Sequence, residues 1–90
     1  MKTIHKHLIS VQDNFPLDLP KDSRILTVQK QNHVLLVWVL CDVSKEKETR
    51  YFRIIGTGWD IEDADGLEYI DTFQQADGNL VWHLFEEYAK

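Results

Sequence analysis

The sequence contains few of the residues that mark several familiar classes of protein. Cys41 is the only cysteine among 90 residues, which excludes an internal disulfide and fits a reducing compartment. The longest apolar run, residues 34–41, is far shorter than the ~20 residues that a transmembrane helix needs. The N-terminal residues include lysines but not the long apolar segment of a signal peptide. We therefore expect a cytoplasmic protein that makes no membrane contact.

Positive charge is missing from most of the C-terminal part of the chain. No Lys or Arg occurs between Arg53 and Lys90, whereas residues 54–89 contain nine Asp or Glu. Residues 1–53 contain nine Lys or Arg and six Asp or Glu, and the net charge of the whole chain is −5. This asymmetry predicts an acidic surface that attracts partners of the opposite charge.

No segment shows a convincing long helical pattern, and the chain reads as a series of short strands. Strand-like segments cover residues 3–9, 15–20, 23–31, 34–43, 49–55, 67–73 and 80–88. Asn32-His33 predicts a hairpin turn between two of them. The connections are too short for the crossover helices of a parallel sheet. We predict one all-β domain over residues 1–90, a small antiparallel sandwich or open barrel of six or seven short strands.

The two prolines and the apolar run predict where two of these strands lie in a sheet. Pro16 and Pro20 cannot donate to a ladder of backbone hydrogen bonds, so residues 15–20 should form an edge segment. Phe15, Leu17 and Leu19 alternate there and should contact the core. Residues 34–41 are apolar at both sets of alternating positions, which predicts a central strand covered on both faces.

The stretch GTGWDIEDADG, residues 56–66, contains three of the four glycines. A phosphate-binding loop would need a lysine, and a dinucleotide-binding loop would need glycine in place of Ile61. Asp63, Asp65 and Gly66 match part of an EF-hand loop, but Thr72 stands where its last ligand, a glutamate, belongs. An irregular Ca²⁺ site stays an alternative. The preferred interpretation is a sharp turn after a strand, with Trp59 folded back on the core.

Catalytic and metal-binding signatures are weak. His5 and His7 have the spacing of paired metal ligands on one strand face, but no further paired ligand accompanies them. The sequence has no G-x-S-x-G motif, and Cys41 has no catalytic signature around it. We expect no metal, no cofactor and no catalytic residue, and therefore a protein that is not an enzyme.

Two sets of side chains suit binding. The candidate protein-binding set is acidic and comprises Asp60, Glu62, Asp63, Asp65 and Glu68. The candidate ligand-binding set has the chemistry to clamp an anionic, nucleotide-like molecule and comprises Arg50, Tyr51, Arg53 and Trp59. Arg50 and Arg53 fall on opposite faces of a strand, so a bulge would be needed for both to line one pocket.

Several segments together resemble a known family. They are MKTIHK (1–6), ILTVQKQ (25–31), LLVWVL (35–40), RYFRIIGTG (50–58), YIDTFQ (69–74) and GNLVWHLFEE (78–87). This pattern resembles that of small phage and prophage proteins of unknown function, the DUF7352-like domains, over almost the whole chain. The resemblance implies a virally encoded accessory protein that acts inside a bacterium. It implies no catalytic residue.

From the charge pattern and the resemblance we expect a binding protein in an infected or lysogenic cell. The leading hypothesis is a counter-defence inhibitor that masks a basic surface of a host protein with its acidic face. One alternative is a sponge that sequesters a small nucleotide-type immune signal, and another is a minor virion component. No direct nucleic-acid binding is expected. A homodimer through residues 3–9 is a further option, although Lys2 and Lys6 are residues that protect such edges.

Overall fold

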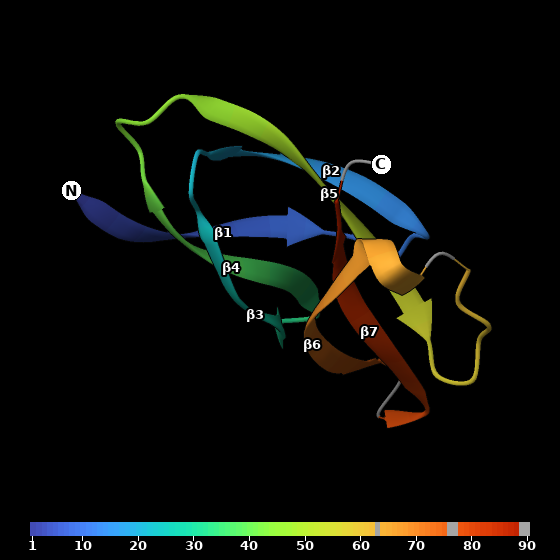
Figure 1. Cartoon of the computed structure of the whole chain (residues 1–90). Helices are drawn as coiled ribbons and strands as arrows, with labels where there is room; N and C mark the ends of the chain where they lie inside the picture. The colour runs from blue at the N-terminus through green and yellow to red at the C-terminus, as the bar shows by residue number, and fades with distance from the viewer. Residues whose placement is uncertain (63, 76–77, 89–90) are drawn as a thin grey trace.

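The chain folds into two antiparallel β-sheets (Figure 1), seen in a computed structural model that describes residues 1–62, 64–75 and 78–88. Sheet A has the order β1-β4-β3, with β1 at Lys2–Ile9, β4 at Val34–Asp42 and β3 at Arg24–Gln31. Sheet B has the order β2-β5-β7-β6, with β2 at Asn14–Pro20, β5 at Lys47–Gly56, β7 at Leu80–Glu87 and β6 at Leu67–Gln75. A short 3₁₀ turn, η1 at Ala64–Gly66, precedes β6.

This arrangement confirms the predicted all-β sandwich. Every strand pair within the two sheets is antiparallel. No helix in the described part of the chain is long and apolar enough to cross a membrane.

The core lies between the sheets and is built from alternate residues of the strands. In β4 the inward row is Leu35, Val37, Val39 and Cys41, all buried. Phe52 and Ile54 of β5 and Leu84 of β7 are buried within the same cluster. Phe15 and Leu19 of β2 join it, and Phe15 stacks on Phe52 with ring centroids 5.5 Å apart. The alternation of apolar residues that predicted the strands therefore also determines which side chains are buried in the core.

The prediction that residues 34–41 form a central strand is correct, but the prediction that both faces of this strand are covered is wrong for its outer face. β4 is the central strand of sheet A, but only its inward face is covered by the other sheet. On the outer face Leu36 is buried, but Val34 is 39% exposed, and Trp38 and Leu40 are only half-buried. Side chains of the neighbouring strands cover part of this face, as where Lys6 Nζ lies 5.6 Å from the centroid of the Trp38 ring. A three-stranded sheet has no second layer to complete the burial.

The predicted hairpin and edge strand are both confirmed. Asn32 and His33 join β3 to β4 with φ angles of 51° and 68°, the left-handed backbone of a tight two-residue hairpin turn. Asparagine adopts this region readily, whereas histidine does so less often. β2 lies at the outer edge of sheet B, where the missing N–H groups of Pro16 and Pro20 break no internal ladder.

Asp71 connects the two sheets where the edge strands β3 and β6 approach each other. Both strands have an irregular register there, β3 between Ile25 and Thr27 and β6 between Tyr69 and Asp71. Asp71 Oδ2 accepts hydrogen bonds from Thr27 Oγ1 at 2.5 Å and from the Val28 backbone N–H at 3.0 Å. One carboxylate thus takes the place of a strand-to-strand ladder and closes this side of the sandwich.

The hydrogen bonds to Asp71 control its ionisation. Partial burial raises the pKa of this carboxyl, but hydrogen bonds from Thr27, Val28 and Thr72 outweigh it and hold the pKa below its usual value. A carboxyl with a lowered folded-state pKa stabilises the fold fully above its unfolded pKa of about 4. This contribution is lost as the pH falls through the folded-state pKa.

We expect Asp71→Asn to lower the free energy of unfolding by about 1–3 kcal/mol at pH 7, because an amide cannot accept all three hydrogen bonds. The variant should also lose stability less steeply than the wild type as the pH falls below about 4. Urea unfolding of both proteins between about pH 3 and pH 7 measures the two effects. Asp13→Asn, at an exposed aspartate, serves as the control. Equal losses in the two variants would contradict a bridging role for Asp71.

Candidate functional site

The loop that follows β5, residues 57–66, is held to the core by a tryptophan. We call it the acidic loop. Gly58 has a φ of 86°, which favours glycine, and the backbone N–H of Trp59 donates to the carbonyl of Gly56 at 3.1 Å. The Trp59 ring lies over Gly56, where a Cβ would be 2.7 Å from Trp59 Cε2. This confirms the predicted sharp turn with Trp59 folded back.

Trp59 closes one end of the core and still presents a large surface to solvent. Its ring meets Trp82 of β7 edge-on, with centroids 5.5 Å apart, and the Trp82 N–H donates to Gln75 Oε1 at 2.9 Å. Trp59 is nevertheless 53% exposed, and Ile61 is 41% exposed in the same loop. Trp59, Trp82 and Leu80 line a shallow groove of about 330 Å³. The loop therefore carries an apolar surface as well as carboxylates.

The acidic loop also holds exposed carboxylates. Asp60, Glu62 and Asp65 are all exposed, and among the described residues no Lys or Arg lies within 4.0 Å of them. Asp63, predicted for the same set, lies outside the described residues. Glu68 follows in β6, is exposed, and accepts a hydrogen bond from the Tyr88 hydroxyl. The predicted acidic set therefore gathers on one loop and the start of the next strand, as far as the structure describes it.

Other carboxylates of residues 54–89 serve the fold. Glu86 is buried and forms a bidentate ion pair with Arg50, with both N–O distances at 2.6 Å. Glu87 lies 3.6 Å from Arg53, and Asp71 joins the sheets. The acidic surface is consequently smaller than the sequence count indicates, and the acidic loop is its centre.

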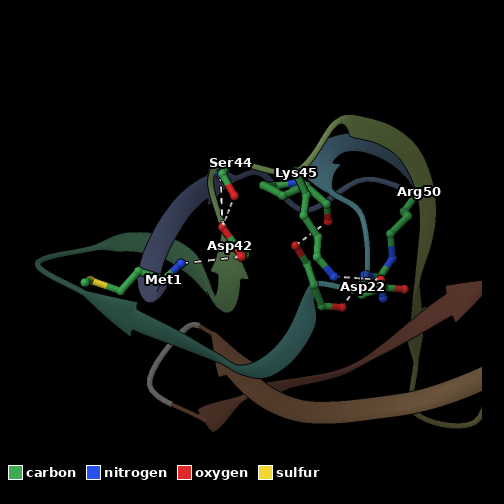
Figure 2. A network of polar contacts seen from close by, with 8 residues as sticks. Met1, Asp22, Asp42, Ser44, Lys45 and Arg50 are labelled. Atoms are coloured by element: carbon green, nitrogen blue, oxygen red, sulfur yellow. Dashed lines mark hydrogen bonds and ion pairs between the residues drawn. The ribbon is translucent and has the colours of Figure 1, made fainter.

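Among the described residues, two lysines and the N-terminal ammonium pair with carboxylates near the turn between β4 and β5. Lys45 Nζ lies 3.0 Å from Asp22, and the N-terminal ammonium lies 3.5 Å from Asp42, which also accepts hydrogen bonds from Ser44 (Figure 2). Lys21 is 3.8 Å from Glu46. These ion pairs contrast with Asp60, Glu62 and Asp65 of the acidic loop, which have no Lys or Arg within 4.0 Å in the part of the chain that the structure describes.

The candidate ligand-binding residues do not line one groove. Arg50 and Tyr51 line a groove of about 530 Å³, whereas Trp59 lines the groove beside β7. Arg53 projects from the opposite face to Arg50, as the alternation predicted, and pairs with Glu87. All three nitrogens of the Arg50 guanidinium donate a hydrogen bond, because Nη1 also donates to the Ser23 carbonyl at 2.5 Å. The hydrogen bonds from Arg50 to Glu86 raise the pKa of the Arg50 guanidinium further.

The C-terminal end of the acidic loop is fixed by Tyr88. Its backbone N–H donates to the Gly66 carbonyl at 3.0 Å. The hydrogen bond from the Tyr88 hydroxyl to Glu68 raises the pKa of Tyr88 to about 12, so the phenol remains a donor at neutral pH. Both ends of the loop are therefore attached, one to Trp82 of β7 and the other to Tyr88, the residue that follows β7.

The sequence predicted the acidic side chains but missed the apolar ones beside them. Ile61 and Leu80 were not singled out, although both are exposed next to Trp59 or in the groove that it lines. The only signal was an isoleucine between two acidic residues in a turn. An exposed aliphatic side chain in such a position has no core to join.

We expect Arg50→Met to destabilise the fold by about 3–5 kcal/mol, because it leaves the buried Glu86 carboxylate without a partner. The double variant Arg50→Met, Glu86→Leu removes both charges and should recover most of this loss. Urea unfolding of the wild type, both single variants and the double variant gives the coupling energy. Additive losses would show that the pair contributes no coupling.

Comparison with known proteins identifies a family for this chain but finds no matching curated protein or solved structure. One family model, described as a domain of unknown function (DUF7352), matches residues 1–90. Because the match covers the whole chain, the protein belongs to the DUF7352 family.

Proposed function

We propose that this protein acts by binding another protein through the acidic loop, and not by catalysis. The observation that carries the proposal is the combination of the exposed side chains of Trp59 and Ile61 with the exposed carboxylates of Asp60, Glu62 and Asp65, which have no cationic partner among the described residues. An aromatic anchor surrounded by polar groups is typical of a protein-binding surface. The carboxylates favour a partner with a basic surface and would accelerate the encounter with it.

The attachment of the loop supports this proposal. Trp59 is held against Trp82 and Gly56, so the apolar anchor is oriented before a partner arrives. Pre-orientation reduces the entropy that binding must overcome. The flattened molecule, with extents of 40 × 35 × 15 Å, suits a surface contact better than an enclosed small-molecule site.

The nucleotide-sponge alternative has less support from the same geometry. The groove that contains Arg50 and Tyr51 is also lined by four carboxylates, those of Asp22, Glu48, Glu86 and Glu87. An anionic ligand would meet more negative than positive charge there. Arg50 would also have to give up its bonds to Glu86 and Ser23.

The setting that we propose is the cytoplasm of a phage-infected or lysogenic bacterium. It follows from the resemblance to phage and prophage proteins, and the partner would then be a basic host defence protein. A phage that this defence restricts should plate better on cells that express the wild-type chain. Cells expressing the acidic-loop variant described next should give no such increase.

We expect Asp60→Asn, Glu62→Gln and Asp65→Asn together to weaken partner binding by at least about tenfold, since each rim charge contributes some tenths of a kcal/mol or more. Trp59→Ala should weaken it further, as loss of an anchor does. The measurement is affinity capture from a bacterial lysate, followed by titration of the captured protein with each purified variant.

The matched control is Asp13→Asn, Glu46→Gln and Glu48→Gln, which removes three exposed carboxylates from elsewhere on the molecule. It should bind like the wild type, and binding of the wild type should weaken as salt is added. If the acidic-loop variant and the control retain the same proteins with equal affinity, the acidic loop is not the binding surface.

A further inference from the structure

Three of the four sheet edges carry a feature that prevents further strands from adding. The β2 edge of sheet B has Pro16 and Pro20, which lack N–H donors. β3 and β6 are the edges of different sheets, but they lie beside each other, both are irregular in register, and Asp71 joins them. Such devices are the usual protection against unwanted strand pairing.

The fourth edge, β1, lacks these devices. β1 pairs with β4 in unbroken register from Lys2–Asp42 to Ile9–Leu35, without a proline or a bulge. Among the described residues no strand pairs with its other side. Lys6, the residue best placed to guard the edge, is turned back over its own sheet and lies against the Trp38 ring. A regular strand of eight residues therefore offers its backbone groups for pairing.

Exposed apolar side chains accompany this open edge. Ile4 is 55% and Leu8 is 70% exposed, and their ladder partners in β4 are Leu40 and Leu36. Both point to the outer face of sheet A, the same face on which Val34 is 39% exposed. Only burial by something outside this chain removes that apolar area from water.

We propose that β1 pairs with β1 of a second copy of this chain, antiparallel and across a two-fold axis. The pairing joins two three-stranded sheets into one six-stranded sheet with the order β3-β4-β1-β1-β4-β3. A second copy fits better than any other occupant, because one symmetric contact closes both open edges at once. The six-stranded sheet then ends at β3 on both sides, and β3 is already protected by β6.

The exposed side chains select the register. In an antiparallel pair, opposite residues point to the same face, so a two-fold axis must pass through a residue pair that is its own symmetry mate. With Lys6 at the axis, Ile4 lies opposite Leu8 of the second copy, and Leu8 lies opposite Ile4. This register buries the two most exposed apolar side chains of β1 against each other. It also places the two Lys6 ammonium groups on the same face near the axis, which weakens the pairing.

The expected dimer is weak and has an unusual salt dependence. A strand of eight residues is only about 26 Å long, so the contact lies at the small end of specific interfaces. We expect a dissociation constant on the order of 10 µM. Because Lys6 repels its symmetry mate, raising NaCl from about 50 mM to about 500 mM should tighten the dimer. Lys6→Thr should tighten it several-fold at low salt.

Sedimentation equilibrium of the full chain over about 1–500 µM tests the dimer. The wild type should fit a monomer–dimer equilibrium, whereas Leu8→Lys should stay monomeric with an unchanged melting temperature, because Leu8 is mostly exposed. Leu80→Lys, at a leucine on β7 that is 46% exposed, is the control and should dimerise like the wild type. A monomeric wild type, or a Leu8→Lys variant that dimerises normally, would overturn the proposal.

Disulfide cross-linking tests the register. Residues opposite each other in an antiparallel pair have Cα atoms about 4.5–5.5 Å apart, within reach of a disulfide. Lys6→Cys should therefore oxidise to a covalent dimer, and His5→Cys should not, while the buried Cys41 gives little background. Cross-linking through residue 5 but not residue 6 would refute this register. The acidic-loop variant should dimerise normally, so the dimer and the proposed function fail or succeed separately.

Discussion

The Asp71 carboxylate is the hydrogen-bonded connection between the edge strands of the two sheets. A three-stranded sheet has too little apolar area to be stable by itself, and sheet A depends on sheet B to cover its inner face. Where β3 and β6 meet, no regular ladder connects them, and Asp71 supplies acceptors for Thr27 and Val28. The irregular registers of β3 and β6 occur at this junction.

Different kinds of side-chain contact cover the core at the two ends of β7. At one end Trp82 packs against Trp59, which leaves an aromatic surface beside the acidic loop. At the other end Glu86 is buried with Arg50, which also holds the Ser23 carbonyl of the turn before β3. The Arg50 guanidinium is thus part of the structure at this end of the core, and its hydrogen bonds stabilise the fold. The acidic loop, in contrast, has polar groups that the fold does not use.

The strands could be predicted from the sequence because each depends on a local pattern. Alternation, the Asn32-His33 turn and the prolines of β2 are properties of neighbouring residues, and they gave strand positions within a few residues. The roles of the acidic side chains could not be predicted in this way. Asp71 and Glu86 differ from Asp60 in the partners that the fold brings to them, Thr27 of the facing sheet for Asp71 and Arg50 of the neighbouring strand for Glu86. The outer face of β4 was misjudged because its hydrophobicity says nothing of how many layers surround it.

The contact between Gly56 and Trp59 holds the start of the acidic loop in place, so the charged residues of the loop are not needed for this purpose. The glycine and the indole fix where the turn begins, and Tyr88 fixes where it returns. Asp60, Glu62 and Asp65, the described charged residues between these two anchors, are exposed and lie outside the strands. Their number, sign and spacing can therefore change in related chains with little effect on folding. A scaffold built in this way can acquire a new recognition specificity by substitutions in one short turn.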